Sequence, residues 1–501
     1  MNVLFILSDQ HNPSFSGCYG HPLAHTPNID SIARRGTRFE SAYCVSPFCV
    51  PARAAMFTGR YAHEIGIWDN TRAWAGTPAG WSHYFRDSGI QLTTVGKLDF
   101  APDADHGVGQ ELMAGHRASM DVCALYRDQI VPRKKIHMAL REIRPRTPDE
   151  PPTKDMEVCD RALEWLSKDR PRDRPWVLNV NFLAPHPGWR PRQDIWTRYQ
   201  GRIKDLPPKY WQKACDLHPA NQAFSAHSCG EAFSRQDVLR CHEAYLAVIE
   251  ELDELVGRLL AALEGEGILD DTLVIYASDH GELMRAHAAW TKCSMYEDSI
   301  RVPLVMAGPG VPAGMVDRAC VSHMDVFPTI AEAVGLPAAW DKRGVSLLGG
   351  GRPAFAFSEF HGNGFPDGIF AIRAGDWKLV ETANQRPQLY NLRTDPDEMN
   401  DLMAGPRTDP AISAKLGELR AMLSSICSPQ AVDLRAKRDQ AQLRAELAAS
   451  GRLVEELAKR GFERRTDKLV NVPDPARNES WSCSPDLTGR TAGLSSRGCS
   501  G

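Results

Sequence analysis

The chain has 501 residues, a formal net charge of −4, and the apolar and charged fractions of an ordinary globular protein. This length allows a large core and favours two domains over one. The slight negative charge excludes a general nucleic-acid binder, because no excess of cations is available to displace counterions. We interpret the basic run Arg133-Lys134-Lys135 as a solvated loop.

The chain begins with a short apolar run, residues 3–7, that is followed at once by Asp9. The run is too short for a signal-peptide core or a membrane span, and it lacks a basic start. No later segment is apolar enough to cross a bilayer, so no membrane contact is expected. The thirteen cysteines show no framework spacing, which is typical of reduced thiols. The sequence therefore predicts a cytoplasmic protein.

Strand-like and helical segments alternate along the first 348 residues. Residues 3–7 predict a buried strand, and Thr26-Pro27-Asn28 opens a short helix that ends at Gly36. A long helix is predicted where apolar residues recur at helical spacing, over residues 235–263. Further strands are predicted at residues 92–95, 176–182, 273–277 and 302–306. This alternation indicates an α/β fold with a large, mostly parallel sheet flanked by helices.

The composition changes at residues 349–353, Gly-Gly-Gly-Arg-Pro, which we interpret as a linker. Four short strand-like runs between residues 354 and 392 predict a small antiparallel sheet. The charged helices that follow, to about residue 459, either mediate a homo-oligomer or cover a core. We therefore predict a large domain over 1–348, a smaller α+β domain over 354–465 and a disordered tail over 472–501.

Chemically capable side chains directly follow four predicted strands: Asp9, Lys97, His186, and Asp279 with His280. Ligands of open α/β sheets bind beyond the carboxyl ends of the strands, so these side chains are expected to meet there. Taken alone, each aspartate is more simply a helix cap. Together the two carboxylates and one imidazole suit Ca²⁺, Mn²⁺ or Mg²⁺ better than a structural zinc.

Cys49 stands two residues before Pro51 and four before Arg53. Pro51 fits the first turn of a helix, which we expect to continue to about Thr58. The amide groups and dipole of a helix N-terminus stabilise an anionic nucleophile or an oxyanion. Arg53, one turn in, can hold the charge of Cys49 or of a substrate oxygen. From these residues alone, a buried inert cysteine is the simpler interpretation, and no redox spacing with Cys44 is present.

The stretch Cys49-Val50-Pro51-Ala52-Arg53 resembles the Cys-x-Pro-x-Arg signature of the sulfatase family, in the alkaline phosphatase superfamily. Further motifs up to about residue 400 resemble the same family: Thr26-Pro27-Asn28-Ile29-Asp30, Gly96-Lys97, Pro185-His186-Pro187, Ser278-Asp279-His280-Gly281-Glu282 and Arg301-Val302-Pro303-Leu304. Asp9-Gln10, Asn70 and Asp279-His280 are similar to the branch of choline sulfatases and phosphonate monoester hydrolases. The resemblance implies an alkaline-phosphatase-like fold with a catalytic domain over 1–348.

The family's chemistry assigns roles to these positions. A formylglycine-generating enzyme oxidises the cysteine, and the hydrated aldehyde attacks the sulfur of a small-molecule sulfate monoester, releasing the alcohol and then sulfate. The modified Cys49, Asp9, Asp279 and His280 would bind the metal, first of all Ca²⁺, with Gln10 close by at the substrate. Arg53 would orient the formylglycine. Four residues would hold sulfate oxygens or protonate the leaving alcohol: Lys97, His186, Asn70 and Lys292.

One position departs from the family pattern. Many sulfatases have a histidine two residues after the lysine of the Gly-Lys motif, where this chain has Asp99. Asp99 either pairs with Lys97 or an arginine, or it changes the substrate to a phosphonate monoester, a phosphodiester or an ester with a cationic portion. We place the sulfate ester first. A catalytically silent, metal-binding member is a third alternative.

Overall fold

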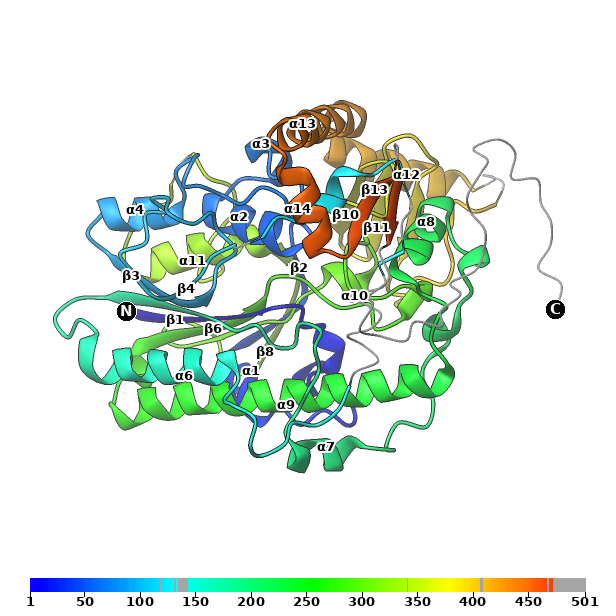
Figure 1. The fold of residues 1–501 in the computed structure, drawn as a ribbon. Helices are drawn as coiled ribbons and strands as arrows, with labels where there is room; N and C mark the ends of the chain where they lie inside the picture. Colours follow the sequence, from blue (N-terminus) through cyan, green and yellow to red (C-terminus); the bar gives the residue numbers. More distant parts are fainter. Residues whose placement is uncertain are drawn as a thin grey trace.

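An eight-stranded sheet forms the centre of the protein (Figure 1). The computed structural model describes residues 1–471 apart from 118, 130–131, 134–142, 340, 406–408 and 466–467, so the predicted tail lies outside the described residues. The strands, in spatial order, are β4 (Gln110–Gly115), β3 (Gln91–Lys97), β5 (Trp176–Asn181), β1 (Asn2–Ser8), β6 (Thr272–Ser278), β7 (Leu304–Ala307), β2 (Thr37–Tyr43) and β8 (Met315–Ser322). Only β7 runs antiparallel to its neighbours, which confirms the mostly parallel sheet.

Helices cover both faces of this sheet (Figure 1). One face packs against α1 (Pro27–Arg35), α6 (Lys154–Glu164) and α9 (Arg235–Gly265). The other packs against α2 (Cys49–Thr58), α4 (Trp81–Asp87) and α11 (Val326–Ala333). The shorter helices are α3 (Ala62–Ile65), α7 (Gln193–Tyr199), α8 (Pro219–Ser228) and α10 (Glu297–Ile300). Because both faces are buried, central strands such as β1 are apolar over most of their length, in β1 from Val3 to Leu7.

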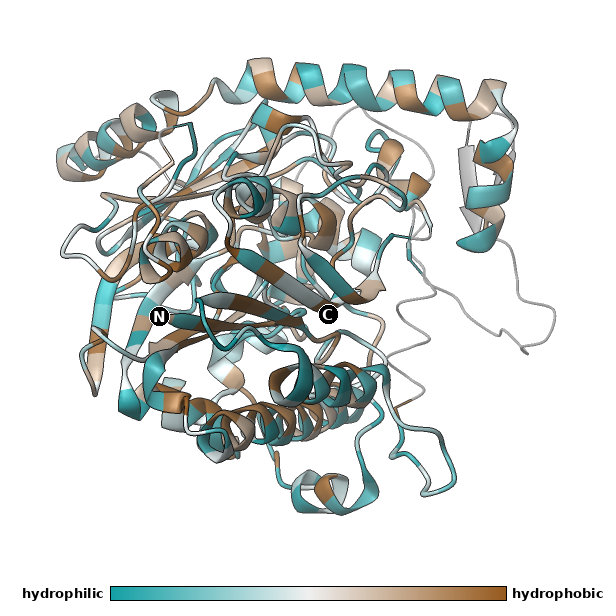
Figure 2. Ribbon diagram, turned by 90° about the vertical axis from the view of Figure 1, so that its left-hand side faces the viewer, coloured by the Kyte–Doolittle hydropathy of each residue, from teal (hydrophilic) through white to brown (hydrophobic). Residues whose placement is uncertain are grey.

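A small antiparallel sheet follows, as predicted. Its strands are β9 (Ala356–Phe360), β10 (Ile369–Ala374), β11 (Trp377–Thr382) and β12 (Gln388–Asn391). Helix α12 (Pro410–Ser424) packs on it. The chain then forms α13 (Pro429–Ala449), α14 (Arg452–Lys459) and the hairpin of β13 (Phe462–Arg465) and β14 (Lys468–Asn471). In Figure 2, α13 runs along the outside of the molecule with hydrophilic and hydrophobic residues mixed along it.

Three strands of the central sheet, β2, β4 and β8, and the C-terminal hairpin of β13 and β14 were not predicted from the sequence. Strand β4 lies at one edge of the sheet and has no fully buried residue, and β8, at the other edge, is partly exposed. Strand β2 alternates buried and half-buried residues and has an irregular register with β8. Edge strands lack the continuous apolar pattern that marks a central strand. Among the described residues, no helix combines the length and apolarity needed to span a bilayer.

Candidate active site

Four potential metal ligands meet at the carboxyl edge of the sheet. Asp9 directly follows β1, and Asp279 with His280 directly follows the neighbouring parallel strand β6. Cys49 is the first residue of α2. All four are at most 2% exposed, and one ligand atom from each lies within 4.8 Å of the others. The structure thus brings together residues that are far apart along the chain.

The imidazole of His280 presents Nε2 to the other ligands. Its Nδ1 lies 3.1 Å from the carbonyl oxygen of Gly281, which assigns the proton to Nδ1 and leaves the Nε2 lone pair available. Nε2 is 3.3 Å from Cys49 Sγ and 3.6 Å from Asp279 Oδ1. Burial alone would raise the pKa of Asp9, but positive groups around it hold that pKa well below its usual value. The two carboxylates and the imidazole, without the sulfur of Cys49, therefore fit a hard divalent cation.

Arg53 holds the two aspartates in place. Its Nε donates to Asp279 Oδ2 at 2.9 Å, and its Nη2 lies 3.5 Å from Asp9 Oδ2. Its Nη1 donates to the backbone carbonyl of Lys97 at 2.5 Å. The guanidinium is buried, so these opposite charges compensate one another. These contacts position the carboxylates, while a role of Arg53 in orienting a modified Cys49 stays a prediction.

Lys97 and Asp99 form a chain of ion pairs that leads away from the metal ligands. Lys97 Nζ pairs with Asp9 and lies 3.2 Å from Asp99 Oδ2. The other oxygen of Asp99 lies 3.3 Å from Nη1 of Arg117. Burial raises the pKa of Asp99, but Lys97 and Arg117 outweigh it and keep that pKa below its usual value. Asp99 thus forms ion pairs with both Lys97 and Arg117, which agrees with the first of the two alternatives given for it in the sequence analysis.

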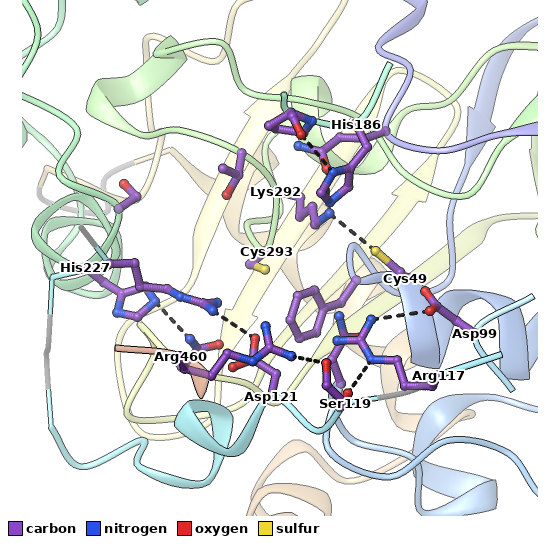
Figure 3. Close-up of a pocket in the computed structure, with 18 of the residues that line it drawn as sticks. Cys49, Asp99, Arg117, Ser119, Asp121, His186, His227, Lys292, Cys293 and Arg460 are labelled. Atoms are coloured by element: carbon purple, nitrogen blue, oxygen red, sulfur yellow. Dashed lines mark hydrogen bonds and ion pairs between the residues drawn. The ribbon is translucent and has the colours of Figure 1, made fainter. Parts of the chain in front are cut away.

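Lys292 is the cation nearest to the cysteine. Its Nζ lies 3.3 Å from Cys49 Sγ and 2.5 Å from Gln10 Oε1 (Figure 3). The Gln10 amide nitrogen donates in turn to Glu282, a fully buried carboxylate. Gln10 and Glu282 therefore orient the ammonium group toward Cys49. Burial lowers the pKa of Lys292, but Cys49 and Asp9 raise it above its usual value, so the amine is charged.

The remaining candidate residues are Cys49, His186 and Asn70. Burial and Asp9 raise the pKa of the Cys49 thiol, but the neighbouring cations, Lys292 first, bring it below its usual value. Burial and the charge of Lys292 hold the pKa of His186 well below its usual value. Asn70 Oδ1 accepts from the backbone N–H of Val50 at 3.0 Å, which caps the start of α2. Asn70 also lines the cavity described below.

Six of the candidate residues line a cavity of about 470 Å³, whereas Asp9, Arg53, Asp279 and His280 lie behind its lining (Figure 3). We call one part of its lining the cysteine side: Gln10, Cys49, Asn70, Lys97, His186 and Lys292. We call a second part of the lining the arginine side: Arg117, Ser119, Asp121, Arg133, Arg460 and Phe462. Figure 3 labels four of these residues, Arg117, Ser119, Asp121 and Arg460. Asp99 joins the two sides through its ion pairs.

The sequence analysis missed Glu282 and the whole arginine side. Glu282 ends the motif that contains Asp279, so that motif was a usable signal. The interpretation of Arg133 as part of a solvated loop was wrong, because its side chain is 15% exposed, pairs with Asp121 and lines the cavity. No local pattern marks an arginine that reaches a site only through the tertiary fold.

Comparison with known proteins places the chain in a family. The model of the sulfatase family matches residues 1–336, and that of the C-terminal part of N-sulphoglucosamine sulphohydrolase matches residues 285–424. Arylsulfatase K of Homo sapiens is 30% identical over 80% of this chain and 78% of its own length. A choline-sulfatase of Rhizobium meliloti (strain 1021) is 30% identical over 88% of this chain and 90% of its own.

A similar fold occurs in the solved structure of BT4656 in complex with its substrate D-glucosamine-2-N,6-O-disulfate. That structure has a TM-score of 0.70 and 21% identity, and the match covers 87% of this chain and 98% of that one. The chain therefore belongs to the sulfatase family and is a sulfuric ester hydrolase. The buried cluster of Asp9, Cys49, Asp279 and His280 fits the metal ion that this family generally uses.

Proposed function

We propose that residue 49 works as formylglycine, made from Cys49 by a formylglycine-generating enzyme, and that one divalent cation assists it in hydrolysing a small-molecule sulfate monoester. The observation that supports this is the place of Cys49 Sγ, at the start of α2, beside three metal ligands and 3.3 Å from Lys292 Nζ. Hydrated formylglycine there would supply a hydroxyl nucleophile. A cation held by Asp9, Asp279, His280 and residue 49, Ca²⁺ before Mn²⁺ or Mg²⁺, would polarise the sulfuryl oxygens.

The chain's own groups bind and orient the ester. Lys97 and Asn70 donate to the sulfuryl oxygens from the cavity wall, and Arg53 keeps the two aspartates in position. Lys292 or His186 gives a proton to the departing alcohol oxygen. Gln10 and Glu282 hold Lys292 for this task, since they fix its ammonium group beside residue 49.

The names of the relatives support an organic sulfate as substrate: an arylsulfatase, a choline-sulfatase and a protein bound to a sulfated glucosamine. We also propose a cytoplasmic location, since the cysteines of the described residues form no disulfide. Fractionation of the native host tests it, and recovery outside the cytoplasm would overturn it.

Parallel assays of sulfur and phosphorus esters test the substrate class. We would compare kcat/KM of the wild type for 4-nitrophenyl sulfate, a 4-nitrophenyl phosphonate monoester and bis(4-nitrophenyl) phosphate, with Cys49→Ala as the blank. The sulfate should be favoured by at least about tenfold. A preference for either phosphorus ester would reject the proposed substrate class, and turnover equal to the blank for all three would favour a silent protein.

A further inference from the structure

Three arginines from separate segments line the same cavity as Cys49: Arg117, Arg133 and Arg460. Figure 3 labels two of them, Arg117 and Arg460. Arg117 follows β4, Arg133 lies in the loop after the turn Val122–Leu125, and Arg460 follows α14. The side chains of Arg117 and Arg133 are 18% and 15% exposed. Guanidinium groups in such a partly desolvated wall attract anions more strongly than they would in open water.

The acidic groups of the lining are already paired. Asp99 lies between Lys97 and Arg117, and Asp121 Oδ2 accepts from Arg133 at 3.0 Å. Arg460 donates to Ser119 Oγ at 3.1 Å, and within the described part of the chain no carboxylate forms an ion pair with it. Among the described lining residues, five lysines and arginines face two aspartates. One sulfate group beside Lys97 and Lys292 leaves the arginine side with uncompensated positive charge.

From this arrangement we infer that the alcohol portion of the substrate carries a second oxyanion, a carboxylate or a further sulfate, and that Arg460 with Arg133 and Arg117 binds it. The inference rests on the proposed function and adds to it that the leaving alcohol is negatively charged. A guanidinium fork matches both oxyanions, because it donates two parallel hydrogen bonds. The rings of Phe48 and Phe224 also line the cavity and offer apolar surface to the body of the alcohol.

The residues that complete this subsite lie at the far end of the chain. Arg460 and Phe462 lie beyond both matched family ranges, which end at residues 336 and 424. Apolar side chains fix α13 and α14 on the turn Val122–Leu125, among them Leu443, Leu447 and Leu457. The C-terminal helices therefore act as a specificity element, since they bring Arg460 and Phe462 to the cavity wall.

A cationic alcohol is the competing possibility, since a choline-sulfatase is among the relatives. A quaternary ammonium group needs unpaired acids or an aromatic cage. Here both aspartates of the lining are bound to arginine or lysine, and the aromatic rings share the lining with five lysines and arginines, whose charges repel a quaternary ammonium group. The structure therefore favours the anionic alcohol, and the cationic one becomes an outcome of the test.

The test measures KM and kcat for four esters: phenyl sulfate, 3-sulfooxybenzoate, benzene-1,3-disulfate and choline sulfate. For the wild type, one of the two doubly anionic esters should have the lowest KM, and which of them does so separates carboxylate from sulfate. Arg460→Ala should raise that KM about 10- to 100-fold, with the KM for phenyl sulfate changed less than about twofold. Arg460→Lys should recover part of the loss, because it keeps the charge without the fork.

Arg438→Ala is the matched control, since Arg438 lies on α13 with its side chain 74% exposed and should leave every KM unchanged. Equal KM changes for all esters in Arg460→Ala, or a lowest KM for choline sulfate, would overturn the inference alone. If the wild type hydrolyses none of the four, the proposed function fails with it. Arg460→Lys decides the question if Arg460→Ala does not fold.

Discussion

The cysteine side and the arginine side of the cavity are built in different ways. Asp9, Lys97 and Asp279 follow or end strands of the central sheet, and Cys49 begins a helix packed on it. The arginine side comes from the segment that follows the edge strand β4, from the loop after the turn Val122–Leu125 and from the C-terminal end of α14 with β13. This turn and the C-terminal helices pack in an apolar cluster of their own, separate from the clusters of the central sheet. The difference indicates that the sheet fixes the chemistry, whereas peripheral segments select the alcohol.

Removal of the metal should abolish the chemistry of the cysteine side and leave the arginine side unchanged. Of the changes considered, it should lower kcat the most. Asp279→Asn replaces a charged ligand with a neutral one and removes the charge that pairs with Arg53 at 2.9 Å. We expect loss of the bound cation and a fall in kcat of about 10³-fold or more, because the cation supplies several kcal/mol of charge stabilisation. Elemental analysis and sulfate release after chelation and re-addition of Ca²⁺, Mn²⁺ or Mg²⁺ measure both quantities.

Asp253→Asn is the matched control for this substitution. Asp253 is a buried aspartate on α9 that accepts from the backbone of Asn28 and Ile29, away from the cavity. It should keep the metal and kcat, whatever its effect on stability. Full activity of Asp279→Asn without metal would contradict the proposed site, and a second bound ion would point to the group His106, Glu111 and His116.

The dependence of kcat on the leaving group of the ester identifies the proton donor. If Lys292 protonates the alcohol, Lys292→Ala should lower kcat about 10²- to 10⁴-fold for an alkyl sulfate and much less for 4-nitrophenyl sulfate. A good leaving group needs little protonation. His186→Ala should then lose activity on both esters to the same degree. The reverse pattern would assign the proton transfer to His186. If each variant lost the same activity on the alkyl sulfate as on 4-nitrophenyl sulfate, both residues would be excluded as the donor.

The sequence predicted the centre of the fold and most of the cysteine side, for a physical reason. Strands β1, β3, β5 and β6 are nearly fully buried and rich in apolar or β-branched residues, and the polar residues at or directly after their ends necessarily meet at one edge of a parallel sheet. Asn70 and Lys292 follow no strand, and only the family resemblance suggested them. The three arginines follow no such rule, because loop and helix packing alone brings them to the cavity.

Asp99 forms ion pairs with both sides of the cavity. Its removal should lower activity less than the substitutions above. Asp99→Ala frees Lys97 and Arg117 of a shared partner. We expect kcat/KM for aryl sulfate to fall about tenfold, because Lys97 keeps its pair with Asp9 and loses only one of two anchors. The ratio of sulfate to phosphonate turnover should stay the same. A shift of that ratio toward sulfate would instead assign Asp99 to the choice of substrate class.

Mass spectrometry of the peptide that contains Cys49, from protein made in its native host, tests the central claim most directly. The account predicts that residue 49 carries an aldehyde in place of the CH₂–SH group. Cys44 lies five residues earlier, is fully buried, and its Sγ lies 4.0 Å from the backbone carbonyl oxygen of Ser299. It should keep its thiol and serves as an internal control. An unmodified thiol at residue 49 in protein that hydrolyses sulfate esters would contradict the account.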